Sequence, residues 1–154
     1  MASRILVVDD HDVVRAGVRT ILATRPEWEV CGEATNGKMA VAMARELQPD
    51  LIVMDITMPV MSGLEAAREI AKYNLPSKVL VLSMHELHYK IEDLIRMGIR
   101  GYVLKSDAVR DLTRALDELS GGGTFLNRPG PDPSGSQNSP KRMPGMFCMA
   151  LGWA

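Results

Sequence analysis

The sequence lacks several features that mark special classes of protein. No apolar run approaches membrane-spanning length, and the first residues lead into an apolar stretch too short for a signal peptide. The two cysteines, Cys31 and Cys148, lack the spacing of a metal or redox motif. The net charge is −1, so no overall positive field attracts nucleic acid. These absences predict a protein of the reducing cytoplasm.

What is present is typical of one soluble globular domain. The chain has 154 residues, of which 46% are hydrophobic and 24% charged, enough for one domain with a real core. Residues 127–154 show no periodicity and contain five prolines and four glycines. We therefore predict a folded domain over residues 1–123 and a disordered tail rich in Pro, Gly and Ser over residues 124–154.

Within the predicted domain, five apolar runs of strand length alternate with segments of helical periodicity. The fourth helical segment has the weakest pattern, while Asn36 and Asp107 stand where helix caps are expected. This alternation predicts an α/β fold with a doubly wound parallel sheet and helices on both faces. The expected strands are residues 5–8, 29–34, 51–55, 78–83 and 100–105, and the expected helices are residues 12–25, 37–47, 64–72, 87–97 and 108–120.

Polar side chains follow the carboxyl ends of four of these strands. The first strand is followed by Asp9 and Asp10, the third ends at Asp55, and the last two end at Ser83 and Lys105. A single acid at such a position is most often a turn residue or a helix cap. Together these residues meet at one edge of a parallel sheet, where ligands bind. Three clustered carboxylates repel unless a cation neutralises them, which predicts a Mg²⁺ site.

Four stretches of the sequence, in this order and spacing, resemble the receiver domain of two-component response regulators. The resemblance covers roughly residues 3–120 and is greatest to the NarL/FixJ (LuxR-type) branch. It implies a flavodoxin-like fold with strand order 2-1-3-4-5. The matching stretches are Ile5–His11, Asp50–Pro59, Val79–Ser83 and Gly101–Lys105.

The resemblance also implies a phosphorylation site. Asp55 would accept a phosphoryl group from a histidine kinase. Asp10, Asp55 and the backbone carbonyl of Thr57 would ligate Mg²⁺, and Asp9 would act mainly through a water. His11, His85 and His88 have no ligand spacing, and we interpret them as surface residues.

Three further residues would transmit the signal. By the same resemblance, Lys105 would pair with the acceptor or its phosphate, Ser83 would bond the phosphoryl group, and Tyr102 would move with it. We place the switch in residues 84–105. The expected partner surface, which would also serve a homodimer, is the fourth helix, the fifth strand and the fifth helix.

Members of the NarL/FixJ branch usually continue into a helix-turn-helix domain, and residues 127–154 show no such pattern. Direct DNA binding by this chain is therefore not expected, and we favour a protein-binding switch. The alternative is a transcription regulator that has lost its DNA-binding domain. A helix-turn-helix pattern in the translated downstream DNA would favour the alternative.

An enzyme is the third class of function, and the sequence argues against it. A haloacid-dehalogenase-type phosphatase needs a second Asp two residues after the nucleophile, where this chain has Thr57. A dinucleotide-binding protein needs glycines after the first strand, where this chain has acids that repel a pyrophosphate. We expect no turnover beyond the chain's own phosphorylation and dephosphorylation.

Overall fold

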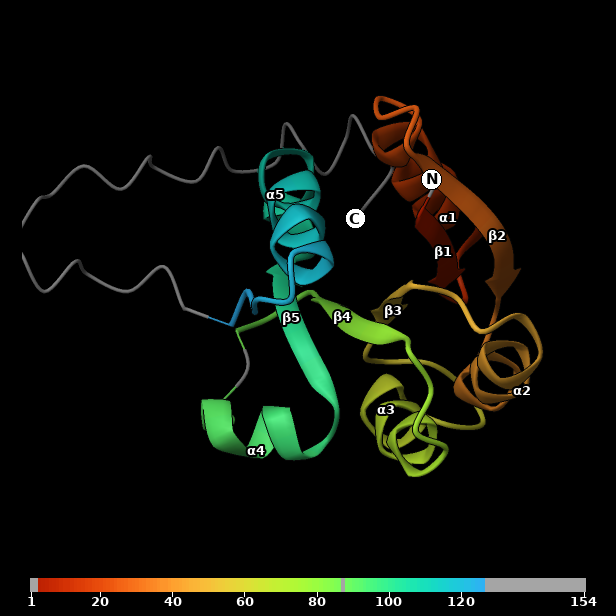
Figure 1. The fold of residues 1–154 in the computed structure, drawn as a ribbon, viewed down its shortest axis with the longest axis vertical. Coiled ribbons are helices and arrows are strands. Elements are labelled where there is room, and N and C mark those ends of the chain that lie inside the picture. Colours follow the sequence, from red (N-terminus) through yellow and green to blue (C-terminus); the bar gives the residue numbers. More distant parts are fainter. Residues whose placement is uncertain (1–2, 87, 127–154) are drawn as a thin grey trace, which may run out of the picture.

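The computed structural model describes residues 3–86 and 88–126, so the predicted tail from Asn127 onward lies outside the described residues. Five parallel strands form one sheet in the order β2-β1-β3-β4-β5, with helices on both faces (Figure 1). This order confirms the flavodoxin-like fold. Within the described ranges, no helix is long and apolar enough to cross a membrane. The elements are β1 (Ser3–Val8), α1 (Asp12–Leu22), β2 (Trp28–Ala34), α2 (Gly37–Leu47), β3 (Leu51–Asp55), α3 (Gly63–Lys72), β4 (Lys78–Ser83), α4 (Ile91–Arg96), β5 (Ile99–Leu104), a 3₁₀ turn (Lys105–Asp107) and α5 (Ala108–Ser120).

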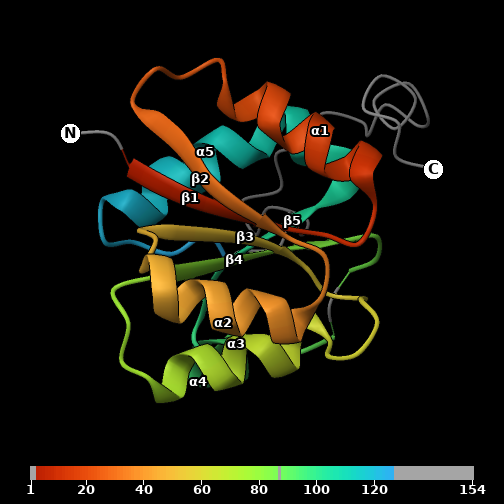
Figure 2. The ribbon, with the colours of Figure 1, turned by 90° about the vertical axis from the view of Figure 1, so that its right-hand side faces the viewer.

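The sheet lies between two layers of helices. Figure 2 shows α1 and α5 over one face and α2, α3 and α4 over the other. Successive strand side chains point to opposite faces, so Ile5 and Val7 pack with α1 and α5, whereas Leu6 and Val8 pack with α2 and α3. The inner strands are apolar on both faces because each face is covered, as expected for a parallel sheet.

The strand register brings the carboxyl ends together. Val8 of β1 pairs with Met54 of β3, and Asp55 pairs with Leu82 of β4. Ser83 in turn pairs with Leu104 of β5. The residues that follow these strands therefore lie side by side along one edge of the sheet, where the sequence analysis expected the site.

One of the two predicted caps is confirmed. The Asn36 side chain accepts a hydrogen bond from the Met39 amide, which satisfies one of the unpaired N–H groups at the start of α2. Asp107 stands at the N-cap of α5 but makes no capping hydrogen bond with its side chain. Its carboxylate instead lies 3.8 Å from Arg110, and the turn of 3₁₀ helix before α5 sets the chain direction there.

The fourth helix is shorter than predicted. It covers only Ile91–Arg96, whereas periodicity suggested residues 87–97. Its N-cap, Lys90, makes no side-chain hydrogen bond to the first turn, and Leu94 is the one buried residue of the helix. A helix with so little buried surface gains little from tertiary packing, which explains the short span. Gly98 follows with a φ of 82°, as expected for a glycine that ends a helix.

The packed part of the chain continues past the predicted boundary at Gly123. Phe125 pairs with the edge of β5, since its amide donates to Arg100 and its carbonyl accepts from Tyr102. Leu126 is 4% exposed and joins the core cluster on the side of α4. Phe125 and Leu126, which belong to the segment predicted as a tail, are therefore part of the packed domain, and Phe125 pairs with its edge strand.

Candidate functional site

Lys105 links two acids at the carboxyl edge of the sheet. Its ammonium nitrogen lies 3.1 Å from Oδ2 of Asp9 and 3.3 Å from Oδ1 of Asp55. All three residues are at least 95% buried. A charged lysine in such a place needs opposite charges close by. The structure thus brings together three of the residues that the sequence analysis selected.

Burial raises the pKa of the Asp55 carboxyl to about 6, and the neighbouring charge of Asp9 adds to the effect. Lys105 acts in the opposite direction, through its charge and its hydrogen bond, without cancelling the rise. Removing the ionised carboxylate from water is the dominant cause. A cation placed beside Asp55 would offset this cost.

The donor atoms at this edge fit a divalent metal ion. One ligand atom from each of Asp9, Asp10, His11 and Asp55 lies within 4.8 Å of the others. Carboxylate oxygens suit Mg²⁺, and the side chain of Asp10 is 29% exposed, which leaves room for metal-bound water. Thr57 is exposed in the loop after β3, and the role of its carbonyl stays a prediction.

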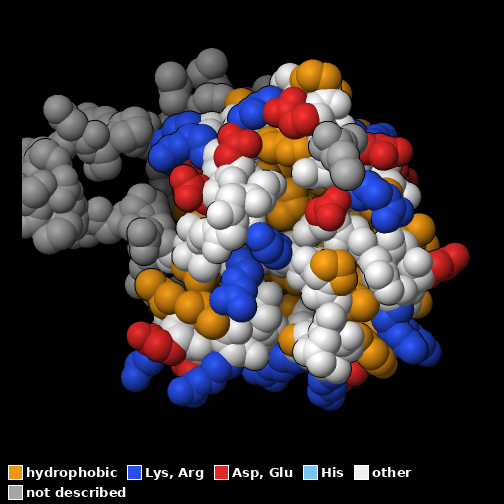
Figure 3. Space-filling model, in the orientation of Figure 1, with side chains coloured by type: hydrophobic (Ala, Val, Ile, Leu, Met, Phe, Trp, Pro, Cys, Tyr) orange, Lys and Arg blue, Asp and Glu red, His pale blue; other side chains and the backbone are white. Residues whose placement is uncertain are grey.

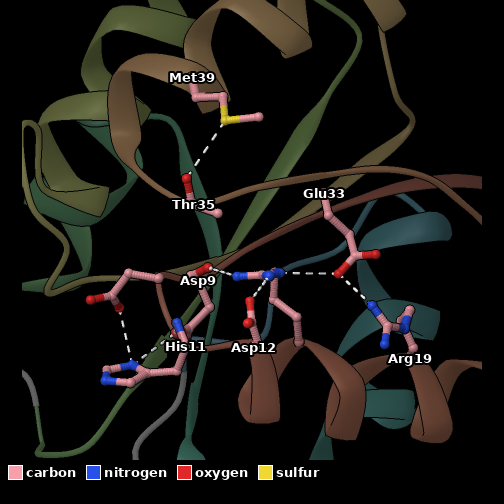
Figure 4. A network of polar contacts seen from close by, with 9 residues as sticks. Asp9, His11, Asp12, Arg19, Glu33, Thr35 and Met39 are labelled. Carbon is pink, nitrogen blue, oxygen red and sulfur yellow. Dashed lines mark hydrogen bonds and ion pairs between the residues drawn. The ribbon is translucent and has the colours of Figure 1, made fainter.

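The loop that holds Asp9 and Asp10 is fixed by an arginine that sequence analysis missed. The Arg15 side chain, 12% exposed, donates to the Asp9 backbone carbonyl at 2.7 Å and to Glu33 of β2 at 3.1 Å. It also contacts Asp12, and Arg19 shares Glu33 (Figure 4). These contacts join β1, β2 and α1. Only the spacing of Arg15 one helical turn after Asp12 was visible in the sequence.

Ser83 and Tyr102 meet at the backbone of His85. The Ser83 hydroxyl donates to the His85 carbonyl at 2.5 Å and accepts from the His85 amide at 3.1 Å. The Tyr102 hydroxyl donates to the same carbonyl at 3.4 Å. Both side chains are 7% exposed. The structure therefore connects two of the three residues predicted to transmit a signal, through a carbonyl that no sequence pattern indicated.

The acids and the lysine at the ends of β1, β3 and β5 lie within the part of the chain that a family model matches. The model for the response regulator receiver domain matches residues 5–117. This chain belongs to that family. Receiver domains are signalling modules of two-component systems that interact with histidine kinases and use Mg²⁺ in an acidic pocket.

Curated relatives of this receiver domain are regulators of the NarL/LuxR type. The chain is 40% identical over 124 residues to the transcriptional regulatory protein YdfI of Bacillus subtilis, covering 80% of this chain and 58% of the relative. It is 34% identical over 123 residues to the nitrate/nitrite response regulator NarL of Escherichia coli, covering 80% and 57%. The chain thus spans a little over half the length of these relatives, and only their receiver part.

Solved structures agree with this placement of the receiver domain. The signal receiver domain of a NarL response regulator from Mycobacterium tuberculosis matches with a TM-score of 0.73 and 30% identity, covering 79% of this chain and 98% of that one. A LuxR-family two-component response regulator from Aurantimonas matches with a TM-score of 0.76 and 32% identity, covering 89% and 94%.

Removing the charge of Lys105 tests the ion pair in this receiver domain. Lys105→Gln is expected to raise the pKa of Asp55 further, by about 1 or more, because an opposite charge at this distance lowers a carboxyl pKa by that amount. The measurement is a ¹³C NMR titration of the Asp55 carboxyl group. Lys72→Gln, which removes an exposed partner of Glu69 on α3, should leave the titration unchanged. An unaltered Asp55 titration in Lys105→Gln would show that the ion pair is absent in solution.

Proposed function

We propose that this receiver domain is a phosphorylation switch in which Asp55 accepts a phosphoryl group from a histidine kinase. The observation that carries the proposal is the buried contact of Lys105 with Asp9 and Asp55 at the carboxyl edge of the sheet. Before phosphorylation, the Lys105 ammonium group holds the acceptor carboxylate of Asp55 in place. It also provides a positive charge for the incoming phosphoryl group. We propose a histidine kinase as the phosphoryl donor because the chain belongs to the receiver family.

In the proposed reaction, one carboxylate oxygen of Asp55 forms a bond to phosphorus. The bond from phosphorus to the imidazole nitrogen of the donor phosphohistidine breaks, and the imidazole leaves with that electron pair. Asp10, Asp55 and the Thr57 carbonyl would hold Mg²⁺, which when bound would neutralise the charge that spreads over the phosphoryl oxygens. Asp9 acts mainly through a water, which agrees with its two oxygens lying against Lys105 and His11.

The proposed switch uses the hydroxyl of Ser83. Phosphorylation adds about −1.5 to −2 charge near neutral pH at the end of β3. To donate to a phosphoryl oxygen, the Ser83 hydroxyl must leave the His85 carbonyl, which it now shares with Tyr102. Loss of the hydrogen bond from Ser83 to the His85 carbonyl allows the backbone at His85 to move. The Tyr102 side chain, which donates to the same carbonyl, moves with that backbone. We therefore place the switch in residues 84–105.

The partner surface is proposed on α4, β5 and α5, and we propose that it also serves a homodimer. Hydrophobic side chains are exposed on α4 and in the segment before it, and the space-filling view shows such side chains at the surface beside Lys and Arg (Figure 3). A solved structure of the related RcsB contains dimers bound to DNA, and it supports dimerisation as a family property. The exposed residues are Met84, Tyr89, Ile91 and Ile95.

A charge on α4 tests this surface. Ile95, 38% exposed, is expected to lie in the contact, so Ile95→Glu should shift the phosphorylated chain from dimer to monomer in sedimentation. Val60→Glu is the matched control, because Val60 is 77% exposed in the loop before α3. A dimer that survives Ile95→Glu, or that Val60→Glu disrupts equally, would place the interface elsewhere.

The switch is proposed to act in the cytoplasm as a binding module. The proposal includes Mg²⁺-dependent phosphorylation from a donor and self-dephosphorylation, and no steady turnover of other substrates. The DNA binding of full-length relatives is not proposed for this chain.

Intact mass after incubation with Mg²⁺ and acetyl phosphate tests the proposed function. We expect a single phosphoryl adduct on the wild type, which chelation of Mg²⁺ by EDTA should prevent. An unmodified chain in the presence of Mg²⁺ would refute the proposal. A phosphoryl adduct that still forms in EDTA would refute only the role of the metal ion and would leave Asp55 as the acceptor.

A further inference from the structure

The edge strand β5 is closed by the two residues that end the described part of the chain. Phe125 forms a parallel bridge with Gly101. Its amide donates to the Arg100 carbonyl at 2.9 Å, and its carbonyl accepts from the Tyr102 amide at 2.9 Å. These bonds fill backbone groups that an edge strand otherwise leaves unpaired. We call Phe125 and Leu126 the latch.

The two side chains of the latch enter opposite faces of the sheet, as successive residues of a strand do. Phe125 is half-buried against the core cluster on the side of α1 and α5, and the Arg114 guanidinium lies 5.9 Å from its ring centroid. That distance is near the outer limit of a cation–π contact. Leu126 is buried in the cluster on the side of α4. Two backbone hydrogen bonds and two apolar side chains therefore hold the latch.

Tyr102 contacts both the latch and the proposed switch. Its backbone amide donates to the Phe125 carbonyl, while its hydroxyl donates to the His85 carbonyl that Ser83 also contacts. Its side chain belongs to the same core cluster as Leu126. Movement of Tyr102 with the His85 backbone is expected to disturb both the packing around Leu126 and the amide that holds Phe125. One residue thus joins the phosphorylation site to the end of the packed domain.

We propose that the latch opens when the domain is phosphorylated, and that its opening passes the signal from β5 to the chain that follows Leu126. The latch suits this role because few contacts hold it. Segments with few buried contacts open locally at a low free-energy cost, without unfolding of the whole domain. An element with a docked and an open position converts a local change of charge into a change elsewhere in the chain. This role rests on the proposed function, because phosphorylation supplies the movement of Tyr102.

Amide hydrogen exchange of the full chain, followed by NMR, tests the proposal. In the unmodified chain, the amides of Phe125 and Tyr102 should be protected by their hydrogen bonds. In the chain phosphorylated with Mg²⁺ and acetyl phosphate, both should exchange at least about tenfold faster, because opening of the latch breaks both bonds. The amide of Ile52, in the central strand β3, should keep its protection. Intact mass of the same sample gives the phosphorylated fraction.

Urea tests whether the latch opens by itself in the unmodified chain. Opening of two residues exposes little surface, so low concentrations of urea should hardly change the exchange at Phe125 but should speed that at Ile52. Leu126→Ala should speed the exchange at Phe125 at least about tenfold, because it removes a buried side chain that holds the latch. Val109→Ala is the control, because it shortens a 40% exposed side chain on α5, and it should leave this rate unchanged.

Three results would overturn the inference and leave the proposed function intact. The first is a Phe125 amide that stays protected in a chain whose mass shows the phosphoryl adduct. The second is exchange at Phe125 that urea speeds as steeply as at Ile52, since the latch would then open only with the domain. The third is an unchanged Phe125 rate in Leu126→Ala. Absence of the adduct would instead refute the proposed function and, with it, the inference.

Discussion

Asp55→Asn is expected to abolish phosphorylation by acetyl phosphate while leaving the chain folded. The amide has no negatively charged oxygen to attack phosphorus, and it removes a carboxylate from the proposed metal site. Intact mass in the presence of Mg²⁺ measures the adduct. A loss of phosphorylation is informative only if the variant is folded, and the electrostatics of the site predict that this variant is more stable than the wild type.

The gain in stability follows from the raised pKa of Asp55. A folded-state pKa of about 6, against the ordinary value of 3.8, means that the fold favours the protonated carboxyl. Its contribution to stability is fully present below about pH 4 and is lost as the pH rises through 6. Above that pH the ionised carboxylate costs roughly 2 to 3 kcal/mol. Asp55→Asn removes this cost, so the gain should appear at pH 8 and vanish near pH 4.

Urea unfolding in EDTA at the two pH values measures the free energy of unfolding. Asp93→Asn serves as the control, because Asp93 pairs loosely with Arg96 on the surface of α4, and its effect should be small at both pH values. Two results would contradict the argument. One is an adduct on Asp55→Asn, which would place the acceptor elsewhere. The other is a variant that is less stable than the wild type at pH 8, which would mean that the Lys105 contact outweighs burial.

The features that could be predicted from the sequence are those that local pattern and chain direction determine. The apolar runs before Asp9, Asp55 and Lys105 indicated strands that are buried on both faces. Because parallel strands all point the same way, their final residues had to meet at one edge. The strand order itself came from the resemblance, since periodicity does not distinguish which buried strands are neighbours.

The features that could not be predicted depend on contacts between distant parts of the chain. Arg15 reaches the Asp9 carbonyl and Glu33 of β2, and nothing in a helical pattern reveals such a contact. Phe125 and Leu126 follow a run of glycines that looked like the end of the domain, yet the exposed edge of β5 offers unpaired backbone groups that this segment fills. The start of α4 was predicted too early, because apolar residues at helical spacing do not show whether they are buried, and Ile91 and Ile95 of α4 are exposed.

Gly63→Ala is expected to destabilise the fold by about 1 to 3 kcal/mol, although alanine is the better helix former by about 1 kcal/mol. Gly63 begins α3, and its amide donates to the Ile56 carbonyl at 2.7 Å. A Cβ atom at this position would lie 2.1 Å from the Asp55 carbonyl oxygen. Since the obstacle is backbone, the start of α3 or the end of β3 must move. Urea unfolding measures the loss.

Gly121→Ala is the matched control. It stands at the C-cap of α5 with a φ of −79°, and the nearest atoms to an added Cβ are 3.6 Å away, so the change in stability should stay within about 0.5 kcal/mol. A Gly63→Ala chain as stable as the wild type would show that α3 can shift freely. If stability falls as expected, the folded fraction should also accept phosphate more slowly, because the displaced backbone is that of Asp55. Gly63 would then be required to position the acceptor Asp55, and not to form α3.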